Sequence, residues 1–138
     1  MEVIVDRIKD STFAARGDTG HWVVMDTRKE FGGSEGASSP MEMVLMGLGG
    51  CTGIDVQTIL QKMRVEVDHF SIRIAAERAA EHPKVFTRIH MIFAFRGMDL
   101  DEEKIHKAVH LSHDKYCSVS AMLSKTAEFS FEIQIFPK

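Results

Sequence analysis

Two cysteines are the residues in this sequence most able to do chemistry. Cys51 lies in a glycine-rich apolar segment, and Cys117 lies in the run Lys-Tyr-Cys-Ser-Val-Ser. Two thiols in such settings are typical of a redox pair, in which one attacks an oxidant and the other closes a disulfide. A free cysteine in an apolar helix is about as often a small buried hydrophobe. The pair therefore indicates thiol chemistry as a hypothesis, beside an inert structural role.

A reactive Cys51 needs a cation nearby, because the thiolate is the nucleophile and burial disfavours it. Arg16 and Arg28 are the nearest candidates by topology, although an arginine on a strand is usually a solvated charge. Asp55 shares a helix face with Cys51 at the i, i+4 spacing. Alone it would repel a thiolate, but paired with an arginine it could hold that arginine over the sulfur. A partly solvated carboxylate is the plainer alternative.

Cys117 is expected just before a short helix, where a thiolate is stabilised and where a resolving cysteine would serve. One competing pattern includes it, since His106, His110, His113 and Cys117 form a stripe at helical spacing. Histidine and thiolate suit zinc. However, no partner motif accompanies the stripe, and the helix is expected to break before Cys117. We therefore expect no metal and no cofactor.

These residues need elements to position them, and the first half of the chain predicts a hairpin sheet followed by a long helix. Strands are expected at 2–9, 11–17 and 20–27, and a loop at 31–39. Ser39, Pro40 and Glu42 then form a capping box that opens a helix to about residue 63. Four glycines inside this helix indicate close backbone approach, at Gly47, Gly49, Gly50 and Gly53.

The second half predicts a hairpin, two helices and a last strand. The expected strands cover 65–78, with a bulge near His69, and 85–96; the helices cover 99–114, opening at Asp99, and 119–125; the final strand covers 129–135. The order βββ-α-ββ-α-α-β predicts an α+β fold, with an antiparallel sheet packed on a long central buried helix.

The composition fits one domain over residues 1–138. The chain has a net charge of −3 and 44% hydrophobic residues, with no basic stripe for nucleic acid and no polybasic block for a membrane surface. Without an export signal, the default compartment is the reducing cytoplasm. A domain this small cannot easily surround the helix at 40–63 on every side, so we expect an intertwined homodimer.

Two motifs resemble the OsmC/Ohr family, the osmotically inducible and organic hydroperoxide resistance proteins. The first runs from Gly32-Gly33 through Ser39-Pro40 to Cys51, and the second is Tyr116-Cys-Ser-Val-Ser-Ala121. The resemblance covers nearly the whole chain, including the hairpin between the helices. It implies an intertwined homodimer with active sites at the subunit interface.

The resemblance also implies a cysteine-based peroxidase for organic hydroperoxides, acting in stress and antioxidant defence. Cys51 matches the peroxidatic position and Cys117 the resolving position, with an external dithiol as reductant and no metal or flavin. One residue departs from the pattern: Met41 stands where a glutamate orients the activating arginine, and Glu42 is placed as a cap. The alternative is a non-catalytic dimer of the same fold that binds a small apolar ligand or senses redox state through its thiols.

Overall fold

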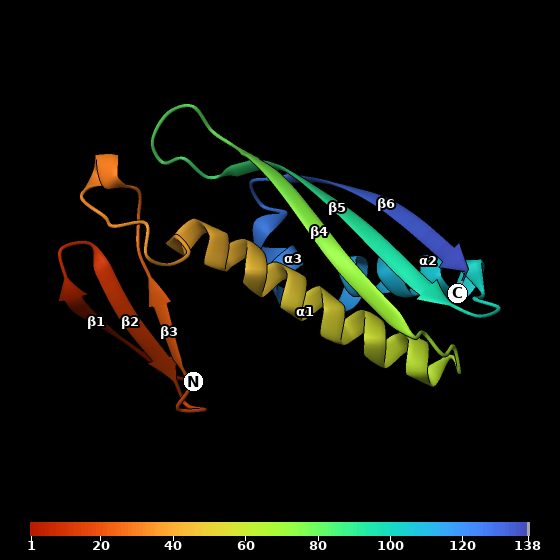
Figure 1. Ribbon diagram of the computed structural model, residues 1–138. Helices are drawn as coiled ribbons and strands as arrows, with labels where there is room; N and C mark the ends of the chain where they lie inside the picture. The colour runs from red at the N-terminus through yellow and green to blue at the C-terminus, as the bar shows by residue number, and fades with distance from the viewer. Residues whose placement is uncertain (138) are drawn as a thin grey trace. The chain divides into compact units, whose positions relative to one another are not determined.

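The computed structural model describes residues 1–137, and its order of main elements is the predicted one (Figure 1). The elements are β1 (Val3–Lys9), β2 (Thr12–Gly17), β3 (Trp22–Met25), the 3-10 turn η1 (Lys29–Phe31), α1 (Pro40–Lys62), β4 (His69–Arg78), β5 (Phe86–Gly97), α2 (Glu102–Leu111), the π turn η2 (Ser112–Tyr116), α3 (Ser118–Leu123) and β6 (Glu128–Pro137). Internal contacts divide the chain into two compact units, the first ending at Met46 and the second beginning at Gly47.

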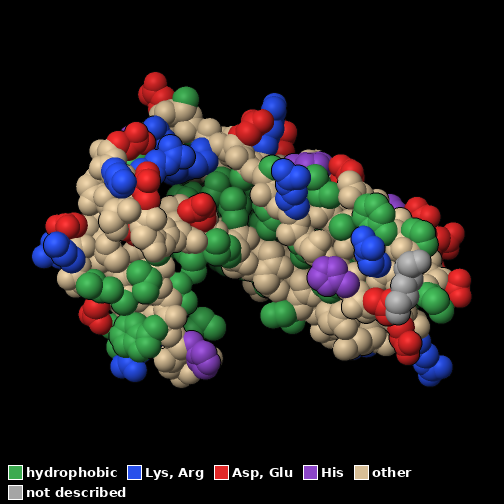
Figure 2. Space-filling view, viewed as in Figure 1, with side chains coloured by type: hydrophobic (Ala, Val, Ile, Leu, Met, Phe, Trp, Pro, Cys, Tyr) green, Lys and Arg blue, Asp and Glu red, His purple; other side chains and the backbone are tan. Residues whose placement is uncertain are grey.

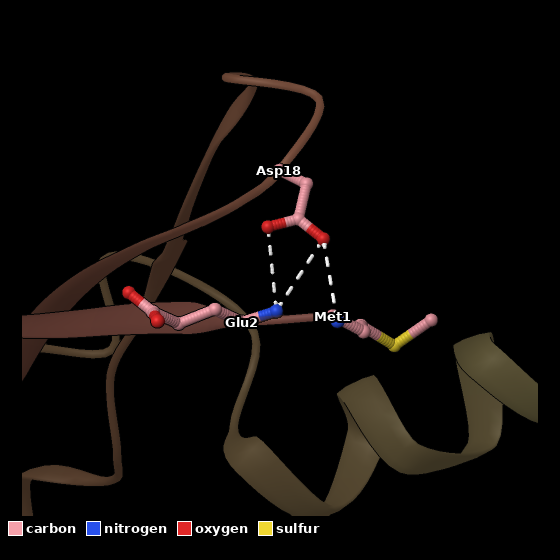
Figure 3. A network of polar contacts seen from close by, with 3 residues as sticks. All are labelled: Met1, Glu2 and Asp18. Atoms are coloured by element: carbon pink, nitrogen blue, oxygen red, sulfur yellow. Dashed lines mark hydrogen bonds and ion pairs between the residues drawn. The ribbon is translucent and has the colours of Figure 1, made fainter.

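The first unit is a three-stranded antiparallel sheet in the order β1-β2-β3. Asp18, in the turn after β2, ties down the start of the chain (Figure 3). Each of its carboxylate oxygens accepts from the Glu2 amide at 3.3 Å, and one lies 3.9 Å from the Met1 amino group. Large apolar side chains stay exposed on this sheet, among them Val3, Val5, Ile8, Trp22 and Val24. Figure 2 shows hydrophobic side chains at the surface of this unit.

A buried aspartate shapes the loop that leads from β3 into α1. The Asp26 carboxylate accepts hydrogen bonds from the Ser34 hydroxyl and amide and from the amides of Thr27 and Gly36. The Ser34 hydroxyl, followed by these amides, holds the pKa of Asp26 far below its ordinary value. The backbone amide of Asp26 also donates to the Ser38 carbonyl at 3.1 Å. Hydrogen bonds to the side chain and backbone of Asp26 therefore hold the loop from its first residues to Ser38, just before α1.

The capping box predicted at the start of α1 is confirmed. Glu42 Oε2 accepts from the Ser39 amide at 2.7 Å and from the Ser39 hydroxyl at 2.8 Å, while the Ser39 hydroxyl accepts from the Glu42 amide at 3.3 Å. The helix ends where Arg64 adopts a left-handed φ of 58°. Residues 65–68 then form no strand, so the strand predicted from residue 65 begins only at His69.

One of the α1 glycines permits close packing on β4. A β-carbon at Gly49 would lie 3.2 Å from Ile74, whereas one at Gly53 would lie 3.7 Å from Ile72, an ordinary van der Waals contact. Nothing lies within 4 Å of the corresponding positions at Gly47 and Gly50. The expected close approach is thus found at Gly49 among these four glycines, and the neighbour is a strand.

The second sheet has the order β4-β5-β6, and one part of its predicted topology is wrong. β4 and β5 pair antiparallel as expected, but β6 runs parallel to β5. The chain therefore crosses over through α2, η2 and α3 before it returns as β6. The break in the β4–β5 register lies between Glu77 and Arg78, and not near His69.

Helices cover one face of this sheet, and the core lies between the two layers (Figure 1). α1 packs on β4, while His110 of α2 and His113 of η2 pack on the ring of Phe131 in β6. Between them, β5 contributes alternate side chains that are fully or nearly buried: Ile89, Met91, Phe93 and Phe95.

The second helix begins later than predicted. Asp99 has a left-handed φ of 49°, which places it in a turn, and Asp101 is the residue that caps α2. Its carboxylate accepts from the Lys104 amide at 3.1 Å. The last helical turn is a π turn, which replaces the predicted continuation of the helix to residue 114.

In the single chain, α1 is buried along one stripe, formed by Leu48, Thr52, Val56, Ile59 and Leu60. Within the described part of the second unit, nothing covers the other side of this helix, where Ile54 is 70% exposed, so that unit alone does not provide the expected burial on every side. By length and composition alone the helix could cross a membrane, with a mean hydropathy of 1.4, as many core helices could. Its buried stripe and its packing on β4 are those of a core helix.

Candidate functional site

The second unit brings the two cysteines together. The sulfurs of Cys51 and Cys117 and a carboxylate oxygen of Asp55 all lie within 4.8 Å of one another. Cys51 and Asp55 come from one face of α1, and Cys117 comes from the crossover between β5 and β6. Cys117 is buried and Cys51 is partly exposed. The site is therefore a pair of free thiols beside a carboxylate, with Cys51 as the accessible thiol.

The π turn and the short helix after it hold Cys117 in place. The Cys117 amide donates to the Ser112 carbonyl at 2.8 Å, which closes the π turn. Its sulfur then accepts from the Ser120 amide at 3.4 Å and lies 3.5 Å from the Thr52 hydroxyl. The Ser120 hydroxyl is buried without a partner of regular geometry in residues 1–137, and the sulfur is the acceptor toward which it can turn.

The two thiols differ in the stability of their thiolates. Burial acts to raise the pKa of Cys117, but hydrogen bonds from Ser120 and Thr52 outweigh it and lower that pKa. The pKa of Cys51 is raised, first by burial, then by its contact with Cys117, and finally by the negative charge of Asp55. The site as it stands in one chain therefore favours the thiolate at Cys117, whereas the sequence placed the attacking thiol at Cys51.

Asp55 is held by a serine and pairs with no arginine among residues 1–137. The Ser112 hydroxyl donates to Asp55 Oδ2 at 3.2 Å. Of the two arginines proposed to activate Cys51, Arg16 stacks on the ring of Trp22 and Arg28 lies 3.7 Å from Glu30. Both arginines belong to the first unit, while the thiols belong to the second. Their role in activation stays a prediction.

Two sequence-based readings of nearby residues have clear outcomes. Glu42 caps α1, as predicted from its place after Met41. The histidine stripe does not converge on Cys117, because His106 faces Glu102 at 3.7 Å and His113 packs on the Phe129 ring at 4.8 Å between centroids. The stripe therefore offers no joint ligand set with Cys117.

Three small hydroxyl residues of the site were not predicted as part of it: Thr52, Ser112 and Ser120. Each hydrogen-bonds to, or lies against, a reactive group. Ser120 was noted beside Cys117 in sequence, but the other two have no motif. Thr52 is adjacent to Cys51, and the 65 positions that separate it from Cys117 hide the contact.

A shallow groove of about 240 Å³ opens beside the carboxylate of this site. Four apolar or aromatic side chains and three polar ones line it, from α1, the residue after it and the crossover: Asp55, Thr58, Ile59, Lys62, Met63, Leu111 and Tyr116. Asp55 belongs both to the groove and to the thiol cluster, so the groove adjoins the cluster on the side of this carboxylate.

The sequence of this chain matches one protein family over most of its length. A family model described as "OsmC-like protein" matches residues 32–132, which include both thiols and Asp55. The chain belongs to the OsmC-like family. Protein YhfA of Escherichia coli K12 is 39% identical to this OsmC-like chain over 135 residues, which are 98% of each protein.

Solved structures agree on the fold. A hypothetical protein from Aquifex aeolicus VF5 superposes with a TM-score of 0.87 at 29% identity, over 99% of this OsmC-like chain and 96% of that one. A structure from Legionella pneumophila, titled as an organic hydroperoxide resistance protein OsmC, superposes with a TM-score of 0.73 over 97% of both chains. At 14% identity, that second likeness shows the fold alone.

Proposed function

We propose that this OsmC-like protein is a thiol peroxidase that reduces organic hydroperoxides in stress defence. The observation that carries the proposal is the meeting of Cys51 and Cys117 within 4.8 Å in a chain of this family. Two proteins with solved structures of the same fold, from Legionella pneumophila and Elizabethkingia anophelis, are described as organic hydroperoxide resistance proteins. A cytoplasmic setting would keep both thiols reduced between turnovers.

In the proposed reaction, the Cys51 thiolate attacks the terminal oxygen of the hydroperoxide. A sulfur–oxygen bond forms, the oxygen–oxygen bond breaks, and the alkoxide takes a proton to leave as the alcohol. The Cys117 thiolate then attacks the Cys51 sulfenic acid, and hydroxide leaves as water with one proton. An external dithiol then reduces the Cys51–Cys117 disulfide by thiol–disulfide exchange: the two protein thiols are regenerated, and the dithiol leaves as its own disulfide.

The arrangement of the thiols suits this order of events. Cys51 is the more accessible sulfur, so it is the one that a peroxide reaches. Cys117 is buried among donors that favour its thiolate, which is the form that must attack a sulfenic acid. The groove beside Asp55 offers an apolar surface for the alkyl part of the substrate.

The proposed enzyme acts as a homodimer. Exposed apolar side chains on β1 to β3 and on α1 leave surface that a second copy would cover. A homodimer could also bring Arg16 or Arg28 to a thiol, which would offset the burial and the Asp55 charge that now oppose a Cys51 thiolate. Sedimentation of the reduced protein tests this part, and a monomer at micromolar concentration would contradict it.

The peroxidase proposal is tested by one half-reaction. Fully reduced protein, freed of metal by a chelator, is mixed with excess cumene hydroperoxide and analysed by intact and peptide mass spectrometry. We expect rapid loss of both thiols with a Cys51–Cys117 disulfide. Cys51→Ser should form no disulfide, and Cys117→Ser should stop at a sulfenic acid that dimedone traps. Survival of both thiols in the wild-type protein would refute the enzyme proposal.

A second candidate is a non-catalytic dimer that binds a small apolar ligand or senses redox state through its thiols. It is favoured by one observation: Asp55 and burial oppose a Cys51 thiolate, with no arginine paired to Asp55 among residues 1–137. If the dimer binds an apolar ligand, cumene hydroperoxide leaves the thiols intact, and a hydrophobic fluorescent probe binds with an affinity that a Tyr116→Ala change lowers. If it senses redox state, the thiols are oxidised once, but an external dithiol supports no repeated turnover of the hydroperoxide.

A further inference from the structure

The thiol cluster has the donor set of a metal site. Cys51, Asp55 and Cys117 each offer one ligand atom, and these three atoms lie within 4.8 Å of one another. In a tetrahedral zinc site, Zn–S bonds of ~2.3 Å place two sulfurs roughly 3.8 Å apart. The present atoms therefore need to approach by no more than about 1 Å, which side-chain rotation supplies.

We propose that the reduced protein binds one thiophilic divalent cation of the Zn²⁺ class through Cys51, Asp55 and Cys117. The sequence predicted no metal, because the ligand set considered there was the histidine stripe with Cys117. The cluster of Cys51, Asp55 and Cys117 is a different ligand set. Two ligands come from one helix face at the i, i+4 spacing, and the third comes from the start of α3. A water or buffer molecule completes four-fold coordination.

The surroundings of the ligands favour this assembly. The Ser112 hydroxyl donates to Asp55 Oδ2 at 3.2 Å, which orients the carboxylate and leaves its other oxygen for a metal. The Ser120 amide and the Thr52 hydroxyl hold the Cys117 sulfur. Second-shell hydrogen bonds of this kind fix ligands and raise metal affinity.

The negative charge of the three ligands also favours a bound cation. With both thiols deprotonated the three ligands carry three negative charges, and no ion pair in residues 1–137 balances Asp55. A divalent cation supplies the missing positive charge. Two thiolates select soft metals, so Zn²⁺, Cd²⁺ or Co²⁺ fits this site, and Mg²⁺ or Ca²⁺ does not.

Metal binding and disulfide formation exclude each other, because they use the same two sulfurs. The metal would protect reduced thiols, and oxidation by a hydroperoxide would release it: the bound dithiolate, one hydroperoxide and two protons give the disulfide, the free cation, an alcohol and water. The metal site does not depend on peroxidase activity, since a protein without turnover would retain the same ligands.

Cobalt titration of the reduced, full-length protein tests the proposal under anaerobic conditions. We expect saturation at one Co²⁺ per site, a thiolate-to-cobalt charge-transfer band and the intense visible bands of tetrahedral cobalt. Cys51→Ser and Cys117→Ser should each lose the charge-transfer intensity. Asp55→Asn should weaken binding by at least about tenfold. Asp6→Asn, an exposed change on β1, is the matched control and should bind as the wild type does.

A second readout needs no variant. Saturating Zn²⁺ should slow alkylation of both thiols in the wild-type protein by at least tenfold, and a chelator should restore the rate. Weak octahedral cobalt bands without charge transfer, or an unchanged alkylation rate, would overturn the metal site. The peroxide half-reaction is measured separately in chelator. Its failure with intact cobalt binding would therefore refute the enzyme alone, and the reverse result would refute the metal site alone.

Discussion

Replacing Asp55 by asparagine removes a carboxylate charge that lies close to Cys51, while keeping an oxygen that can accept from Ser112. Among residues 1–137, no cation balances the charge of Asp55, and this charge helps to raise the pKa of Cys51. Burial is the largest cause of that raised pKa, the contact with Cys117 comes next, and the Asp55 carboxylate follows. We therefore expect the pKa of Cys51 to fall in Asp55→Asn and its alkylation at neutral pH to become faster.

The size of the effect follows from the separation of the two groups. Unit charges 4.8 Å apart repel by about 0.9 kcal/mol in water and by about 3.5 kcal/mol at an effective dielectric of about 20. Removing that repulsion increases the thiolate population between about fourfold and about three-hundredfold. A less basic thiolate is also a weaker nucleophile, with a Brønsted slope of about 0.4–0.5. The expected gain in rate is therefore between about twofold and about twentyfold.

The assay is iodoacetamide alkylation of Cys51 followed by mass spectrometry, from pH 6 to 10, in a chelator and in a Cys117→Ser background. Asp6→Asn in the same background controls for a change in net charge and should react as its parent does. If Asp55→Asn instead slows alkylation, the carboxylate must act through a cation that it holds over the sulfur. That result would refute the unbalanced-charge reasoning and support the arginine-orienting role predicted from the sequence.

Three further predictions concern the loop and cap that lead into α1. Gly33→Ala should lower the free energy of unfolding by about 1–3 kcal/mol in a urea titration, because a β-carbon there would overlap the Thr27 carbonyl; an unchanged midpoint would show that the loop relaxes without cost. Ser39→Ala should cost about 1 kcal/mol in the same titration through loss of the helix cap, whereas a loss below 0.5 kcal/mol would mean that the loop replaces it. The bonds from Ser34 and nearby amides lower the pKa of Asp26, so its stabilisation is present above the unfolded value of about 3.9 and is lost as pH falls through the lower folded value. The stability advantage of the wild type over Asp26→Asn should therefore shrink as urea titrations move below pH 4, and an advantage that grows with acid would contradict this.

Local patterns predicted the elements of this fold, and their limits explain what was missed. The capping box at Ser39 is a short-range signal, and it is present as predicted. Asp99 and Asp101 carry the same type of signal, and only the left-handed backbone at Asp99 separates them. Val65 to Asp68 have strand-like composition, but the Val65 amide donates to the Leu60 carbonyl in the last turn of α1, and these residues form the connection to β4.

Contacts between residues far apart in the sequence were harder to predict than the local elements. Alternating apolar residues in β6 predict a strand with one buried face, but a period of two is the same in parallel and antiparallel pairing. The connection between β5 and β6 is long enough for a parallel crossover, but a connection of that length permits either direction, so the pattern alone does not decide it. Likewise, the meeting of Cys51 with Cys117 depends on the π turn at Ser112–Tyr116, whose extra residue per turn places the second sulfur.

The parallel pairing of β6 sets an order of events during synthesis of the chain. Cys51 and the β4–β5 hairpin emerge first and form from neighbouring sequence, whereas β6 docks only after the whole crossover has been made. Distant pairings of this kind form late, because loop closure must precede them. The Cys51 thiol therefore emerges before its sulfur partner is anchored. Until then it is open to other thiols and disulfides around the growing chain, and completion of the crossover brings Cys117 beside it.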